Sequence, residues 1–256
     1  MIEILLKRKS IRAYENKPIS AEEREVILQA TLRAPTAGNM MLYSIIEVTD
    51  QSVKETLVKT CDNQPFIAKA PLVWLFLADY QRWMDTFILS GVEQNCTPKR
   101  TIIRKPEEGD LFLACSDALI AAQTSVIAAE SLGIGSCYIG DIMENYEIHR
   151  DLFKLPQYVF PICMLCYGYP TKNQKERKLT SRFDKKYILF ENHYRRLEEK
   201  DFVEMYADKN GSIEEAQNIG QSLYTRKFNA DFTIELNRSV RVILDKWLRD
   251  VNSNKL

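Results

Sequence analysis

Apolar residues recur along the chain in two kinds of run, which predict a mixture of strands and helices. Short runs rich in β-branched and aromatic residues predict buried strands at 43–50, 70–79 and 158–170. Residues 51–60 have helical spacing, and the stretch GIGSCYIGD at 133–141 begins with glycine and turns into a strand or edge segment. These runs alternate too irregularly for a doubly wound sheet, so they predict a mixed α+β domain.

Three further helices are predicted, each by its own signal. Ser20 starts the first, because Ser20-Ala-Glu-Glu23 is a capping-box pattern, and its helical spacing continues as far as Pro35. The strongest signal runs from 111 to 132 without glycine or proline. Its alanines cover more than one face, which predicts a long central helix buried against two partners. The charged tail at 190–256 is predicted to be mostly helical, with an amphipathic stretch at 231–248.

Composition and charge exclude several classes of protein. The 256 residues carry 35 basic and 35 acidic side chains, whereas nucleic-acid-binding domains are usually strongly basic. Six cysteines include one CxxC pair, Cys163 and Cys166, and only two histidines accompany them, so a zinc site is not indicated. The opening MIEILLKRKS has no apolar run that suits a signal peptide or a membrane span. We therefore expect a protein of the reducing cytoplasm with no nucleic-acid or membrane partner.

A cluster of cations stands close to the N-terminus, in RKSIRAYENKPIS at 8–20. On an extended segment Arg8, Ser10 and Arg12 project to the same side, because the side-chain period is two. Two guanidiniums and a hydroxyl form a multi-donor anion site that suits phosphate oxygens. Lys175 and Arg177 make a second basic pair late in the chain. Ordinary solvated charge is the alternative interpretation of both groups.

Two turns of small residues, APTAGNM and GSCYIGD, can bring backbone N–H groups close to a bound ring. In chain order, five segments resemble the nitroreductase family of FMN-dependent flavoenzymes, which reduce nitroaromatics and quinones with NADH or NADPH. They are RKSIRAYENKPIS, APTAGN, DNQPFIAKAP, AAQTSVIAAESLGIGSCYIG and GYPTKNQKERK. The likeness covers roughly residues 4 to 190. It implies an FMN-binding domain at 1–190 with a mainly antiparallel sheet and an insertion at about 80–110, followed by a C-terminal helical extension at 191–256.

The resemblance also implies a cofactor site. The FMN phosphate would be held by the first cluster, including Lys9, and by the late basic pair. Asn63 would hydrogen-bond the polar edge of the isoalloxazine, since an amide both donates and accepts. Two further segments would complete the site: Pro35, Thr36, Ala37, Gly38 and Asn39, reaching in from the partner subunit, and Tyr138, Ile139, Gly140 and Asp141, lining the ring with a backbone N–H of Gly140 or Asp141 facing flavin N5.

The implied assembly is a homodimer in which the two subunits share the FMN site and the long helix belongs to the interface. The implied reaction is ping-pong: NAD(P)H passes hydride to flavin N5 and leaves, and a small-molecule electron acceptor takes its place. No side chain needs to act as acid or base, which agrees with the scarcity of histidine, so no catalytic residue is assigned. No metal is expected.

The chain departs from the family pattern at three places. Met41 stands where many relatives have glutamine, Gly140 where many have a carboxylate, and Phe66 where some have a lysine that contacts the nicotinamide nucleotide. These departures leave the acceptor and the choice between NADH and NADPH open. The insertion at 80–110 is expected to cover part of the pocket, and the tail is expected to wrap the partner subunit.

Three rival functions remain open from the sequence. One keeps the flavin but uses it for reductive dehalogenation or flavin breakdown, with the insertion as a lid. Another is a non-catalytic FMN-binding module. The third is a thiol enzyme that pairs Cys137 with His149, although neither a basic neighbour nor a third orienting residue is evident. Serine hydrolases and P-loop enzymes are disfavoured because GxSxG and GxxxxGK[ST] are both missing from the sequence.

Overall fold

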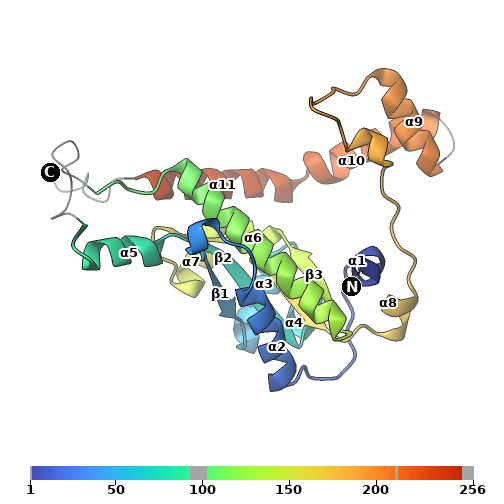
Figure 1. Cartoon of the computed structure of the whole chain (residues 1–256). Helices are drawn as coiled ribbons and strands as arrows, with labels where there is room; N and C mark the ends of the chain where they lie inside the picture. The colour runs from blue at the N-terminus through green and yellow to red at the C-terminus, as the bar shows by residue number, and fades with distance from the viewer. Residues whose placement is uncertain (1, 93–102, 211–212, 250–256) are drawn as a thin grey trace. The chain divides into compact units, whose positions relative to one another are not determined.

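The computed structural model describes residues 2–92, 103–210 and 213–249. Its centre is a four-stranded sheet in the order β1-β2-β4-β3, and every neighbouring pair is antiparallel (Figure 1). The strands are β1 (Tyr43–Glu47), β2 (Leu72–Asp79), β3 (Gly135–Ile139) and β4 (Val159–Gly168). The predicted mixed fold with a mainly antiparallel sheet and a long central helix is confirmed.

Helices precede, connect and follow the strands. The α-helices are α1 (Ile2–Lys7), α2 (Ala21–Leu32), α3 (Gln51–Thr60), α4 (Phe66–Lys69), α5 (Gln81–Leu89), α6 (Glu108–Ser131), α7 (Tyr146–Phe153), α8 (Lys172–Glu176), α9 (Glu199–Asn210), α10 (Ile213–Leu223) and α11 (Asp231–Leu248). Short 3-10 helices are η1 (Ala37–Asn39), η3 (Asp141–Met143) and η4 (Lys185–Tyr187), and η5 (Tyr224–Phe228) is a π-helix.

The sheet is covered on both faces, which explains its unbroken apolar strands. All eight residues of β2 are buried, and from Leu72 to Leu77 the side chains alternate between two cores. Trp74 and Phe76 face a core that they share with the buried alanines of α6 and with Ile27 of α2. Val73, Leu75 and Leu77 face a second core, built with residues of α3 and α4. A strand covered on both sides needs no polar positions, so its sequence reads as a continuous apolar run.

The long helix α6 lies across the sheet beside α2 (Figure 1). It begins three residues before the predicted start, because Asp110 accepts a hydrogen bond from the N–H of Glu107 at 2.9 Å and closes the first turn. Among the described residues, α6 is the one helix long and apolar enough to cross a membrane. Its alanines, however, pack on the sheet as a core helix.

Most predicted boundaries agree with the structure. The capping box of Ser20 and Glu23 is present, and the predicted spans at 51–60 and 231–248 match α3 and α11. The short helix α4 was not predicted, since four residues carry too little periodicity. In the predicted insertion, α5 accounts for 81–89, and residues 93–102 lie outside the described part of the chain.

The chain forms two compact units. One contains the residues up to Arg177 together with those from Glu235 onward, and the other is Lys178–Ile234. Within the second unit, Lys186 pairs with Glu204 at 2.9 Å, and Arg195 pairs with Asp201 at 2.6 Å. The domain boundary predicted near residue 190 stays a prediction.

The part of α11 in the first unit is fastened by a charged cluster as well as by apolar contacts. Trp247 is buried and packs edge-on against Tyr158, with ring centroids 5.4 Å apart. Arg238 bonds both carboxylate oxygens of Glu147 on α7 at 2.8 Å and also reaches Glu235 at 2.7 Å. Its hydrogen bonds lower the pKa of each glutamate to about 2.

This cluster predicts an acid-dependent part of the stability. Because these pKa values are depressed in the folded state, the contribution is present above about pH 4.5 and is lost as the pH falls toward 2. We expect Arg238→Gln to lower the urea midpoint at pH 7 and to have little effect near pH 2. Arg241→Gln, an exposed change on the same helix, is the control. Equal losses at both pH values would contradict the assignment.

Candidate cofactor-binding site

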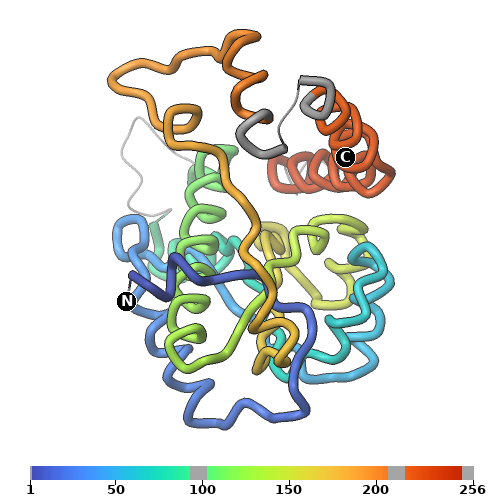
Figure 2. The backbone as a smooth tube through the Cα atoms, turned by 90° about the vertical axis from the view of Figure 1, so that its right-hand side faces the viewer, coloured from blue at the N-terminus to red at the C-terminus, as the bar shows by residue number. Residues whose placement is uncertain are grey.

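The N-terminal segment lies along the sheet edge formed by β3. Ser10 pairs with Ser136 in a parallel bridge, and the N–H of Ile11 donates to the carbonyl oxygen of Ser136 at 2.9 Å. Gly135 permits this approach, because a Cβ atom there would overlap the side chain of Ile11. In Figure 2 the dark blue N-terminal segment passes close to α8, and the N–H of Arg12 donates to Gln174 at 3.3 Å.

Three guanidiniums and one hydroxyl gather at this edge. They lie near the Cys137 thiol on β3. Burial raises the pKa of this thiol, and four neighbouring residues lower it: Arg12, Ser10, Arg8 and Arg177. Arg177 also donates to the carbonyl oxygen of Ser10 at 2.5 Å. The structure therefore brings together predicted residues from both basic clusters, although about 165 residues separate them in sequence.

The two predicted lysines have other partners. The ammonium group of Lys9 donates to the carbonyl oxygens of Lys175 and Arg177, at 2.7 and 2.5 Å, and so ties the two segments together. The ammonium group of Lys175 pairs with Glu15 at 2.8 Å. In this structure Lys9 therefore links the N-terminal segment to the segment at 175–177, and Glu15 partly neutralises the charge of Lys175.

The loop after α3 and the turn after β3 meet beside the cations. Gln64 donates to the carboxylate of Asp141 at 2.7 Å, and the guanidinium of Arg12 stands over the ring of Phe66. Asn63 is exposed in a left-handed conformation, with φ 49°. Gly140 is exposed, with open space where a side chain would stand. These contacts place the predicted residues of both segments in one region.

Tyr138 and Ile139 differ in what they can offer a ligand. Ile139 is buried in the second core, so only its backbone can face a ring. Tyr138 is half-buried, and its hydroxyl donates to Gln123 of α6 at 3.3 Å.

The predicted segment Pro35–Asn39 is held elsewhere in this chain, by a carboxylate that the sequence analysis missed. Asp117 of α6 is buried and accepts a hydrogen bond from the Thr36 hydroxyl. It also accepts from the N–H groups of Ala37 and Leu42, at 3.0 and 3.1 Å. The sequence could have indicated this role, because Asp117 is the one acidic residue in the apolar stretch 111–129. This buried acid fixes the course of the loop.

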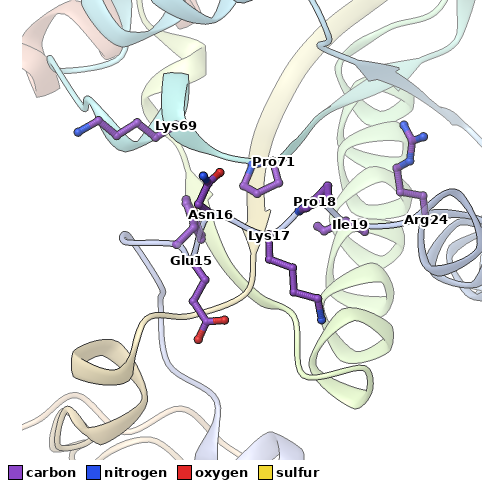
Figure 3. A pocket seen from close by; sticks show the side chains of 9 residues that line it. Glu15, Asn16, Lys17, Pro18, Ile19, Arg24, Lys69 and Pro71 are labelled. Carbon is purple, nitrogen blue, oxygen red and sulfur yellow. The ribbon is translucent and has the colours of Figure 1, made fainter.

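A surface hollow of about 520 Å³ lies next to the cation cluster (Figure 3). It is lined by Tyr14, Glu15, Asn16, Lys17, Pro18, Ile19, Arg24, Lys69 and Pro71. None of the predicted site residues lines it. The hollow is therefore separate from the residues predicted to bind the cofactor.

The alternative thiol site lacks its histidine, although Arg8, Arg12 and Arg177 lie near Cys137 and oppose the rise in its thiol pKa that burial causes. The ring nitrogens of His149 lie 2.8 Å from the carbonyl oxygen of Ile142 and 2.7 Å from the Thr60 hydroxyl. The Cys137 thiol contacts the carbonyl oxygen of Tyr138 instead. The CxxC cysteines are both buried on β4, one in each core. Among the described residues, no group of three or more His, Cys, Asp or Glu side chains could hold a metal ion.

The donor set of the cation cluster fits the phosphate of FMN. Within the described ranges, Arg8, Arg12 and Arg177 form no salt bridge with a carboxylate, although Arg8 lies near the carboxyl of Glu130, whose pKa is raised by burial and lowered by Arg8. The buried hydroxyl of Ser136, next to Ser10, has no hydrogen-bond partner among those residues. Guanidinium and hydroxyl donors are the groups that bind phosphate oxygens in proteins.

Comparison with known proteins identifies the fold first. The structure of nitroreductase A from Vibrio parahaemolyticus is similar, with a TM-score of 0.77 and 25% identity over 95% of this chain and 96% of that chain. The sheet and the central helix thus belong to a nitroreductase-type fold.

The sequence comparisons then identify the family. The sequence model of the nitroreductase family matches residues 5–169. An oxygen-insensitive NADPH nitroreductase from Salmonella typhimurium is 33% identical over 78% of this chain and 76% of its own length. An NADPH-dependent FMN reductase from Bacillus subtilis is 30% identical over 75% of this chain and 74% of its own length. This chain belongs to the nitroreductase family.

Proposed function

We propose that this chain is an FMN-dependent oxidoreductase of the cytoplasm. It takes hydride from NAD(P)H and passes it to a nitroaromatic, a quinone or a related acceptor. The observation that carries the proposal is the gathering of Arg8, Ser10, Arg12 and Arg177 near Cys137 on β3, in a family whose members are named for FMN and NADPH. Three cations gather at one sheet edge, and within the described ranges none of them forms a salt bridge with a carboxylate, although Arg8 lies near Glu130. The FMN phosphate is an anion that such a cluster can bind.

Each part of the site has a separate role. The guanidiniums and the Ser10 hydroxyl hold the phosphate, and the exposed amide of Asn63 bonds the polar edge of the ring. Gly140 has no side chain, and the space beside it is open. The isoalloxazine ring can therefore approach the backbone N–H groups that follow β3. Bound FMN supplies the hydride-accepting atom, and the protein supplies position and electrostatics.

The active form in this proposal is a homodimer, with the cofactor shared between subunits. The face of α6 turned away from the sheet exposes Phe112, Leu113, Leu119 and Ile120, an apolar surface that a second copy would cover. Among the described residues, the side-chain hydrogen bonds of the loop Pro35–Asn39 run to Asp117 and to Met41, and none reaches the cation cluster of its own chain. The loop is therefore free to serve the cofactor of the partner. We propose that the C-terminal extension also wraps the partner.

The first experiment is a visible absorption spectrum of the purified protein, followed anaerobically during addition of NADPH and then NADH. We expect flavin bands that bleach with a nicotinamide and recover with a quinone or nitroarene. Bands that do not bleach would favour a non-catalytic FMN module. Recovery only with a halogenated aromatic would favour the dehalogenase. A colourless protein that takes up no added FMN would overturn the proposal.

Charge reversal tests the phosphate assignment directly. We expect Arg8→Glu or Arg12→Glu to weaken FMN binding by about 10- to 100-fold, since a hydrogen bond to a charged group contributes about 1.5–3 kcal/mol. The melting temperature of the apoprotein should change little. FMN retained on dialysis is the measurement. Lys172→Glu, an exposed change in neighbouring α8, should retain FMN fully. If the arginine variants do the same, the phosphate does not bind there.

A further inference from the structure

Two carboxyl groups meet behind the turn that is predicted to face flavin N5. In η3 the N–H of Glu144 donates to the carbonyl oxygen of Asp141 at 3.0 Å. Side chains three residues apart lie above one another in a 3-10 turn, so the two acids lie on the same side of this turn. A hydrogen bond between the two side chains is one of the causes that raise the pKa of Glu144. Since a carboxylate is only an acceptor, this contact requires a proton on one of them.

The surroundings place that proton on Glu144. Only 4% of Glu144 is exposed, and its Oε1 atom has no hydrogen-bond partner among the described residues. Burial, followed by the neighbouring carboxylate of Asp141, raises the pKa of Glu144 to about 8. Asp141 is only half-buried, and it accepts a hydrogen bond from Gln64 at 2.7 Å.

The other charged groups packed around Glu144 do not offset this effect. Asp62, in the loop after α3, and Glu235 of α11 also raise the pKa of Glu144. Arg238 is engaged by Glu235 and by Glu147. On α7, burial lowers the pKa of His149, which keeps the ring neutral at pH 7.

We propose that Asp141 and Glu144 share one proton at neutral pH, and that this pair donates it to the electron acceptor. The second part rests on the proposed function. When a quinone receives hydride that originates from NAD(P)H, two electrons and one hydrogen nucleus arrive on it, and a hydroquinone anion results. The O–H bond of the carboxyl pair breaks, and an O–H bond forms on the anionic oxygen of the hydroquinone. The pair becomes two carboxylates and regains a proton from water at the half-buried side of Asp141.

The shared proton is tested on the apoprotein by infrared spectroscopy. We expect a protonated-carboxyl band that titrates near pH 8 in the wild-type protein and is missing in Glu144→Gln. That variant keeps the shape and neutrality of the protonated acid, so it should fold. Glu147→Gln, three residues away, is the matched control. The pKa of Glu147 is about 2, so its removal should leave the band unchanged. A wild-type protein without such a band would overturn the proposal.

The donor role is tested with the FMN-loaded protein in two reoxidation reactions. A quinone needs a proton, whereas ferricyanide takes single electrons and needs none. We expect Glu144→Gln to slow reoxidation by quinone at pH 7 at least about 100-fold, the lower end for general acid catalysis, and to leave ferricyanide unaffected. Equal slowing with both acceptors, or none with either, would overturn the donor role. If the chain binds no FMN, the proposed function and the donor role both fail, while the apoprotein band still reports the shared proton.

Discussion

Replacement of Asp117 by alanine is expected to lower the free energy of unfolding by about 2–6 kcal/mol. The change leaves the N–H groups of half-buried Ala37 and buried Leu42 without an acceptor, and an unsatisfied buried group costs about 1–3 kcal/mol. The Thr36 hydroxyl, which also accepts from the N–H of Met41 at 2.8 Å, loses its own acceptor. Urea denaturation measures the loss.

The same variant should also lose cofactor binding in a way that stability alone does not explain. If the loop Thr36–Leu42 serves the FMN of the partner, its displacement weakens binding even under conditions where the variant is fully folded. Asp117→Asn retains one acceptor oxygen and should have an intermediate effect on both properties. Ser116→Ala, an exposed change on the same helix, should have little effect on either. An Asp117→Ala protein as stable as the wild type would show that the carboxylate does not anchor the loop.

Replacement of Gly135 by alanine is expected to displace the N-terminal segment from the edge of β3. The new Cβ atom would overlap the side chain of Ile11, which is buried and branched at Cβ and so has little freedom to turn aside. Overpacking of this kind costs about 1–3 kcal/mol. Because Ser10 and Arg12 flank Ile11, we also expect FMN binding to weaken by at least about tenfold, near 1.4 kcal/mol. Thermal unfolding and a flavin titration measure the two effects.

A second substitution separates steric displacement from other causes. Ile11→Ala removes the atoms that collide, so the double variant should regain part of the FMN affinity that Gly135→Ala loses, a coupling that a double-mutant cycle detects. Gly109→Ala serves as the control, because a Cβ atom there meets nothing within 4 Å. Additive losses in the double variant would indicate that the two residues do not collide.

The sequence predicted the elements whose periodicity is strong. The capping box at Ser20, the fully apolar β2 and the long α6 all follow from local patterns, and each is present. The clustering of Arg8, Ser10 and Arg12 also follows from the period of an extended segment. The convergence of Arg177 on that cluster came from family resemblance, because no local pattern relates residues so far apart.

Contacts that depend on tertiary packing were beyond local patterns. Lys175 pairs with Glu15, and Lys9 bonds the backbone of Lys175. Both contacts depend on how two segments far apart in the sequence pack together. Glu144 carries no sign in the sequence that it is buried, since glutamate is usually exposed. Its position follows from the 3-10 turn at Asp141 and from the docking of α11 nearby.

The hydrogen bonds of Lys9 to the segment at 175–177 bear on when this part of the protein folds during translation. The two carbonyl oxygens that accept hydrogen bonds from Lys9 belong to residues 175 and 177. Lys9 therefore has neither acceptor until most of the chain has been synthesised. Contacts between residues so distant in sequence form late, after local helices and hairpins. A nascent chain shorter than about 180 residues therefore lacks part of the proposed phosphate site, and on this proposal FMN binds only after most of the chain has been synthesised.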